Sequence, residues 1–160
     1  MSEIRATFRR PFHVMAKPVG PACNLACSYC FYLEKGRLYP PAEKYRMPEA
    51  VLEVYIRDYL DSQETPEVHF AWQGGEPTLL GLDFFRRITE IQRLYADGRT
   101  VTNAFQTNGV LLNDDWGEFL AEHHFLVGLS VDGPRHLHNA HRVDRKSRPT
   151  FDRVMRGLEV

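Results

Sequence analysis

Cysteine is scarce in this sequence of 160 residues: three copies lie between positions 23 and 30, and none follows Cys30. An odd number of thiols so close together excludes a disulfide framework, because one thiol would always be left unpaired. Long apolar runs are missing too, so no stretch is predicted to span a bilayer. The basic N-terminal residues Arg5, Arg9 and Arg10 are not followed by the apolar segment of a secretion signal. We therefore predict a cytoplasmic protein, in a compartment that keeps thiols reduced.

A charge excess of either sign is also missing, because 20 Lys and Arg residues balance 21 Asp and Glu residues. This balance gives no support for a nucleic acid or an anionic membrane as a partner. Hydrophobic residues make up 43% of the chain, which is ordinary for a globular protein. The length of 160 residues suffices for one domain with its own core.

The three cysteines, Cys23, Cys27 and Cys30, form the motif C-x-x-x-C-x-x-C. One loop can bring three sulfurs to a single inorganic centre, and thiolates favour iron–sulfur clusters or zinc. A four-iron cluster held by three cysteines would keep one iron open to a ligand that is not protein. The alternative is a structural zinc site with a histidine, such as His13 or His69, as fourth ligand. Zinc fingers usually pair two C-x-x-C halves, and this sequence has no second half.

The rest of the chain alternates between strand and helix patterns, in units whose size suits a parallel sheet. The strand nearest the C-terminus is almost wholly apolar, which predicts burial on both faces. Polar, glycine-bearing stretches follow the strands, at the end where parallel α/β proteins build active sites. Strands are predicted over residues 12–17, 68–72, 101–107 and 125–131, and helices begin near Pro48, Asp83, Asn113 or Asp114, and Thr150.

Four polar features lie at these predicted strand ends. Gly74, Gly75 and Glu76 open a G-G-E-P turn, where two glycines let the main chain approach a ligand and a carboxylate can accept from an ammonium group. A lone Gly-Gly pair would favour a plain strand-to-helix turn, but this pair comes one strand after the cysteine motif. The other features are the turn signal around Asn108 in Q-T-N-G, Ser130 after the last strand, and Arg142 beyond it.

The motif C-x-x-x-C-x-aromatic-C after a first strand resembles the signature of the radical S-adenosylmethionine (SAM) enzymes. This resemblance implies a four-iron four-sulfur cluster whose open iron is chelated by SAM. Reductive cleavage of SAM then gives a 5′-deoxyadenosyl radical that takes a hydrogen atom from the substrate. The family fold is a partial TIM-like barrel of six βα units. We therefore expect an α/β fold of this type, truncated after about four units.

The resemblance also implies roles for individual residues around SAM. Tyr29 fills the aromatic position that lies beside the adenine. Ser130 matches a serine that bonds the SAM carboxylate, and Arg142 lies where related enzymes carry an arginine for the same group. The remaining expected cofactor contacts are Gly74, Gly75 and Glu76 near the SAM amino group, and Gln106 and Asn108 toward the ribose or substrate.

The residue sequences of the motifs resemble those of the anaerobic sulfatase-maturating enzymes in particular. The motifs are C-N-L-A-C-S-Y-C-F-Y, F-A-W-Q-G-G-E-P-T-L, Q-T-N-G and G-L-S-V-D-G-P. These enzymes oxidise a cysteine or serine of a sulfatase to formylglycine, so a sulfatase peptide and a low-potential donor such as flavodoxin or ferredoxin are the implied partners. The family's cysteine-rich SPASM domain and its aspartate general base have no counterpart in the sequence. Residues 1–160 are therefore expected to be the N-terminal portion of the radical SAM core, not competent alone, with the general base beyond residue 160.

Two other functions stay open at this point. One is a related radical SAM enzyme that modifies a different peptide, and the other is a non-catalytic module holding zinc or an electron-transfer cluster. The histidines could suggest a second metal site, but they lack acidic or thiol neighbours and are predicted to be solvated. They are His123, His124, His136, His138 and His141.

Overall fold

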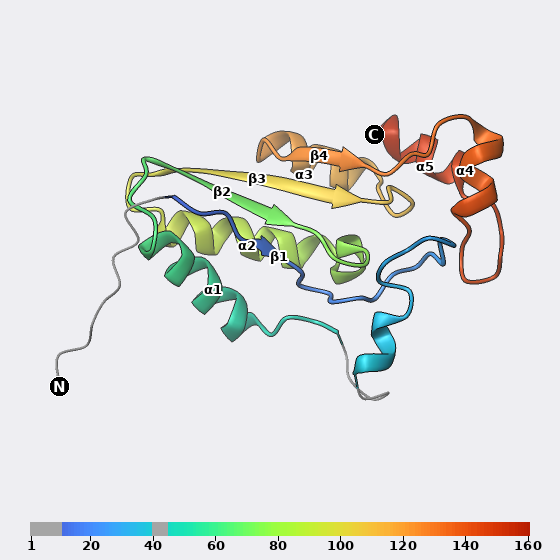
Figure 1. Cartoon of the computed structure of the whole chain (residues 1–160). Helices are drawn as coiled ribbons and strands as arrows, with labels where there is room; N and C mark the ends of the chain where they lie inside the picture. The colour runs from blue at the N-terminus through green and yellow to red at the C-terminus, as the bar shows by residue number, and fades with distance from the viewer. Residues whose placement is uncertain (1–10, 40–44) are drawn as a thin grey trace.

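The computed structural model describes residues 11–39 and 45–160 and contains one parallel sheet with the strand order β1-β2-β3-β4 (Figure 1). The long central pairing joins β2 to β3, from Glu67 opposite Thr100 to Trp72 opposite Phe105. The predicted α/β fold with about four βα units is confirmed. The strands are β1 (Met15–Ala16), β2 (Glu67–Trp72), β3 (Thr100–Thr107) and β4 (Leu126–Leu129).

Helices follow each strand, as the periodicity predicts, and α1 and α2 lie together along one face of the sheet (Figure 1). Asn113 caps α3, and its side-chain oxygen accepts from Trp116 N at 3.1 Å. Pro48 precedes the first helix, which begins one residue later than predicted. The helices are α1 (Glu49–Asp61), α2 (Leu82–Tyr95), α3 (Asp114–Glu122), α4 (Arg135–His141) and α5 (Phe151–Leu158), with short 3-10 turns η1 (Lys35–Leu38) and η2 (Pro77–Leu80).

The core lies between the sheet and its helices and combines aromatic rings with aliphatic side chains. Phe85 of α2 is fully buried, and its ring centre lies 5.1 Å from that of Phe105 and 5.2 Å from that of Trp116. Phe70 and Trp72 of β2 are also buried, while Ala71 between them points to the other face. This alternation fixes which side chains of each strand remain available for function.

The opposite face of the sheet carries a groove of about 480 Å³. Small residues Ala71, Ala104 and Gly128 line its floor, and Gln73 and Gln106 lie toward the end of the strands. The prediction that the last strand is buried on both faces is wrong, because Leu126 is 73% exposed beside this groove. The reason is that no helix in the described ranges covers this face, so an apolar sequence does not imply burial here.

The ends of the sheet also differ from the sequence expectation. The predicted first strand over 12–17 is reduced to Met15 and Ala16, the two residues that pair with β2. Helix α4 was not predicted, because seven residues give too short a periodic pattern. No helix within residues 11–39 and 45–160 has the length and apolar character to cross a bilayer. The predicted absence of a secretion signal rests on residues 1–10, which lie outside the described ranges.

Replacing Phe85 by Ala should lower the free energy of unfolding by about 3–5 kcal/mol, because it opens a cavity among several rings. Leu94→Ala, at an exposed position of the same helix, is the matched control and should change stability by less than about 0.5 kcal/mol. Urea unfolding followed by circular dichroism measures both. Equal losses in the two variants would contradict the placement of the core.

Candidate functional site

The carboxyl ends of the strands point toward a loop that carries all three cysteines (Figure 1). We call residues 18–30 the cysteine loop. It is held on one side by the turn after β2. Gly75 N donates to Gly20 O at 2.8 Å, and Glu76 N donates to Ala22 O at 2.8 Å. A Cβ atom at position 75 would lie 1.9 Å from Ala22 O, so only glycine permits this close approach.

A second segment, residues 141–145, holds the other side of the cysteine loop. Ala26 N donates to Val143 O at 2.8 Å, and Ser28 N donates to His141 O at 2.9 Å. Arg145 Nε donates to Cys23 O at 2.8 Å, which fixes the carbonyl of the first cysteine. These contacts were not predicted, because they join segments more than 100 residues apart and leave no periodic signal in the sequence.

The three cysteines lie within eight residues of one loop, and burial shifts the pKa of two of them. Burial raises the pKa of Cys23 to about 11, and the neighbouring charges of Glu76, Cys27 and Cys30 also raise it. Burial likewise raises the pKa of Cys27, although the Arg142 guanidinium opposes this. Burial therefore disfavours the thiolate forms of Cys23 and Cys27. A bound metal centre would supply the missing positive charge.

The two histidines proposed as the fourth ligand of a zinc site lie away from the cysteine loop in this structure. His69 lies within β2, where its Nδ1 is 2.6 Å from Thr102 Oγ1, and His13 lines the same pocket as His69 beside the start of β2. Both histidines are thus at the opposite end of the strands from the cysteine loop. Over the described ranges, no three Cys, His, Asp or Glu side chains converge as ligands of one metal ion.

The donor set instead suits a four-iron cluster, in which each thiolate binds a different iron and the sulfurs need not meet at one point. The surroundings include a further hint. Asn24 Nδ2, one residue from Cys23, is a buried donor with no hydrogen-bond partner in the described structure. A cluster has sulfide acceptors, so this side chain fits such a group.

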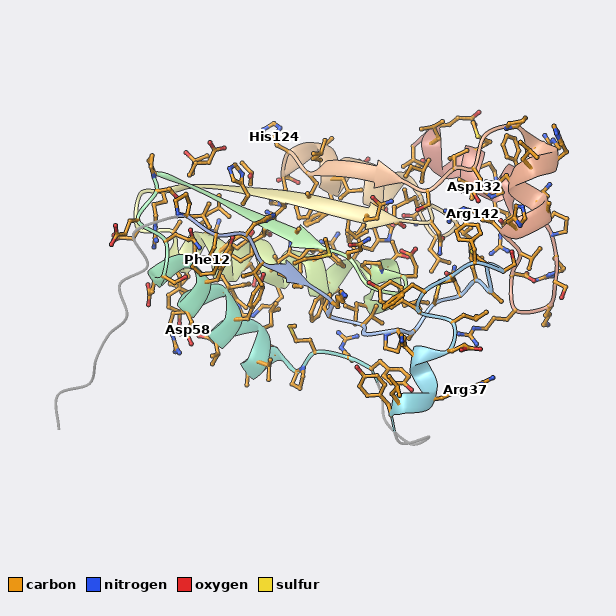
Figure 2. The ribbon with its side chains drawn as sticks, in the orientation of Figure 1. Phe12, Arg37, Asp58, His124, Asp132 and Arg142 are labelled. Atoms are coloured by element: carbon orange, nitrogen blue, oxygen red, sulfur yellow. The ribbon has the colours of Figure 1, made fainter. Side chains whose placement is uncertain are left out.

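Two predicted SAM contacts, Tyr29 and Arg142, meet at Asp132. Arg142 Nε donates to Asp132 Oδ1 at 2.9 Å (Figure 2). Tyr29 OH also donates to this carboxylate. The Arg142 guanidinium lies 5.5 Å from the centre of the Tyr29 ring. Burial alone would raise the pKa of Asp132, but the hydrogen bonds from Tyr29 and Arg142 lower it. Asp132 was not predicted as a site residue, and it links the cysteine loop to α4.

Gln106 and Ser130, predicted separately, are neighbours at the ends of β3 and β4. Gln106 Nε2 donates to Ser130 Oγ at 3.0 Å, and Ser130 N donates to Thr107 O at 3.0 Å. A Cβ atom at position 128 would lie 2.3 Å from Gln106 Oε1, so the absence of a side chain at Gly128 leaves room for the side-chain amide of Gln106. Because the Ser130 oxygen accepts this bond, its own O–H remains available to donate elsewhere.

Glu76 is fully buried rather than open to solvent. Its carboxylate accepts from the backbone N and Oγ1 of Thr78, from Thr107 Oγ1 and from Asn108 N. Asn108 in turn donates from Nδ2 to Asn24 Oδ1 at 2.7 Å. The structure therefore brings the predicted residues Glu76 and Asn108 together, beside the first cysteine.

The prediction that all the histidines are solvated is wrong for His138. This residue is fully buried, its Nδ1 accepts from Asp132 N at 3.5 Å, and its Nε2 lies 3.1 Å from Thr150 Oγ1. Burial and the nearby Arg142 lower its pKa. Its burial depends on the packing of α4 against the start of α5, which the sequence did not reveal. His124, His136 and His141 are exposed, as expected.

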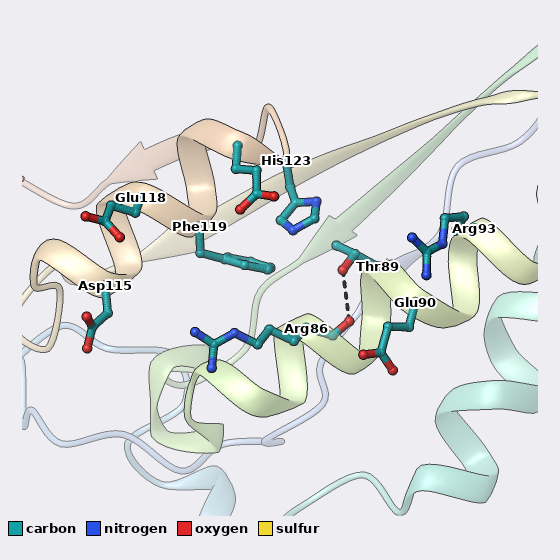
Figure 3. A pocket seen from close by; sticks show the side chains of 9 residues that line it. Arg86, Thr89, Glu90, Arg93, Asp115, Glu118, Phe119 and His123 are labelled. Atoms are coloured by element: carbon teal, nitrogen blue, oxygen red, sulfur yellow. Dashed lines mark hydrogen bonds between the residues drawn. The ribbon is translucent and has the colours of Figure 1, made fainter.

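A second hollow, of about 440 Å³, lies on the outer surface between α2 and α3 (Figure 3). It is lined by charged side chains of both signs, among them Arg86 and Arg93 of α2 and Glu118 and Glu122 of α3. None of the predicted site residues lines it. The strand-end site around the cysteine loop is therefore the better candidate for chemistry.

Comparison with known proteins agrees with this choice. A serine-type anaerobic sulfatase-maturating enzyme of Bacteroides thetaiotaomicron is 46% identical over 155 residues, covering 97% of this chain and 37% of the relative. A cysteine-type enzyme of Clostridium perfringens is 40% identical over 151 residues, covering 94% and 40%. The solved structure of native anSMEcpe with bound AdoMet matches with a TM-score of 0.84 and 40% identity, covering 93% of this chain and 41% of that chain.

This chain thus spans about two fifths of the length of these relatives. The model of the radical SAM superfamily matches residues 18–160, which include the cysteine loop, the ends of β2, β3 and β4, and both of the segments that hold the loop. A match over this much of the sequence, together with the fold and the three-cysteine motif, places the chain in the radical SAM superfamily.

Proposed function

We propose that this chain forms the cluster- and SAM-binding part of an enzyme that oxidises a cysteine or serine of a sulfatase to formylglycine. The observation that carries the proposal is the three-cysteine loop at the carboxyl ends of the strands, with Ser130 and Arg142 at the same edge. The similarity to serine-type and cysteine-type maturases supports the choice of reaction. The general base and the cysteine-rich domain of the proposed whole enzyme are expected beyond residue 160.

The cysteines would hold a four-iron four-sulfur cluster through their thiolates. When bound, the reduced cluster and SAM supply the means to remove a hydrogen atom from a substrate. The Ser130 O–H is free to donate to the SAM carboxylate, because Gln106 occupies its oxygen. Asp132 accepts a hydrogen bond from one N–H of Arg142. The remaining N–H groups of the guanidinium suit the carboxylate of SAM. Tyr29, 55% exposed beside this pair, offers a ring face to the adenine.

The sulfatase peptide would lie in the groove on the open face of the sheet. This groove leads to Gln73 and Gln106 at the strand ends, so a side chain placed there faces the proposed SAM position. Small residues on its floor leave room for a peptide. A low-potential protein such as flavodoxin or ferredoxin would reduce the cluster. The free state of all three cysteines suits a reducing cytoplasm.

Anaerobic reconstitution of the protein with iron and sulfide should load about four irons, and adding SAM should change the EPR spectrum of the reduced cluster. Cys27→Ala should abolish this loading, because one iron loses its thiolate. His69→Ala, the control, should load iron normally, since His69 lies within β2. Iron analysis and EPR spectroscopy test this. Uptake of zinc without iron, or an EPR spectrum that does not change when SAM is added, would contradict the proposal.

Ser130→Ala should weaken SAM binding about tenfold to hundredfold, because a hydrogen bond to a charged group contributes about 1.5–3 kcal/mol. Iron content should stay near that of the wild type, since Ser130 is proposed to contact SAM and not the cluster. Thr89→Ala on the outer face of α2 is the matched control and should bind SAM normally. Equilibrium dialysis with labelled SAM measures the affinities. Unchanged affinity in Ser130→Ala would remove this residue from the site.

A further inference from the structure

Glu76 is a buried carboxylate that uses hydrogen bonds instead of a cation. It is fully buried, and none of the ion pairs found between described residues includes it. A buried carboxylate is tolerated only when its oxygens are satisfied by other donors. Two of its four donors belong to Thr78 and two lie at the end of β3, in Thr107 and Asn108. Glu76 therefore ties the end of β2 to the end of β3.

This arrangement fixes the side chain of Asn108. Its backbone N donates to Glu76 Oε2 at 2.7 Å, and its Oδ1 accepts from Val110 N at 3.0 Å. Asn108 is buried, so water does not compete for the amide. With the backbone and the amide oxygen both held, the amide NH2 group has one direction left, toward the cysteine loop.

The amide NH2 group reaches the first cysteine. Asn108 Nδ2 lies 3.7 Å from Cys23 Sγ while it donates to Asn24 Oδ1 at 2.7 Å. Leu25 N is a second donor to the same sulfur, at 3.4 Å. Hydrogen bonds to the sulfurs of an iron–sulfur cluster are one of the means by which proteins set its reduction potential. They stabilise the reduced form more, because it carries more negative charge.

We propose that Asn108 is a positioning residue of the cluster, which donates to the Cys23 sulfur, raises the reduction potential and is held in place by Glu76. This inference rests on the proposed function, since it requires a cluster at Cys23. It gives Asn108 and Glu76 a different role from the expected contacts with SAM. Both residues act on the cluster side of the site, whereas Ser130 and Arg142 act on the SAM side.

The test is a potentiometric EPR titration of the anaerobically reconstituted protein without SAM. Asn108→Leu keeps the size of the side chain and removes its donor. At a fixed potential we expect its ratio of reduced to oxidised cluster to fall about tenfold, which corresponds to about 59 mV for one electron. Glu76→Gln should shift the ratio in the same direction by a smaller factor, because Asn108 loses part of its support. Thr89→Ala, on the outer face of α2 and away from the site, is the control and should keep the wild-type potential.

A second variant tests whether the effect of Asn108→Leu comes only from losing the turn contact between Val110 N and Asn108 Oδ1. Asn108→Ser retains an oxygen that can accept from Val110 N but is too short to reach Cys23, so it should also lower the potential. Wild-type potentials in both Asn108→Leu and Asn108→Ser would overturn the proposal. A changed SAM affinity with an unchanged potential would overturn it too, and would return Asn108 to the SAM side. If the wild-type protein takes up no cluster, the proposed function fails first, and the two failures are thereby distinguished.

Discussion

The closure of the cysteine loop against the strand ends is the constraint on which the site depends. A loop with three thiols and few periodic residues has no stability of its own, so its conformation must come from its neighbours. The backbone of Gly75 and Glu76 binds it on one side, and residues 141–145 bind it on the other. The Glu76 carboxylate accepts hydrogen bonds from the end of β3 and so connects this turn to β3. The cysteine loop is thereby held in place by the two central strands.

The parts of the fold that the sequence predicted are those with a strong local period. Phe70 and Trp72 alternate with polar or small residues, and the apolar stripe of α2 repeats at helical spacing, so their buried faces could be read directly. The burial of the last strand was predicted wrongly, because Leu126 is apolar yet exposed where no described element covers the sheet. Helix α4 and the burial of His138 arise from tertiary packing, for which a single sequence carries no period.

The candidate site was predictable to the extent that strand ends meet at one edge of a parallel sheet. That rule, with the family resemblance, placed the cysteines, Gln106 and Ser130 together, and the structure joins Gln106 to Ser130 directly. It did not reveal Asp132 as the partner of Tyr29 and Arg142, or the path from Glu76 through Asn108 to Cys23. These links are polar contacts between distant segments, and only the packed structure identifies which donor meets which acceptor.

The central claim is that the cluster on Cys23, Cys27 and Cys30 has one iron open to SAM. It is tested most directly by electron–nuclear double resonance on the reduced protein with SAM labelled in its methionine carboxylate and amino groups. Direct ligation predicts hyperfine coupling between the cluster and both labels, and its loss when Cys27→Ala prevents cluster assembly. A loaded, reduced cluster that shows no coupling to either label would contradict the assignment of this loop as a SAM-binding centre.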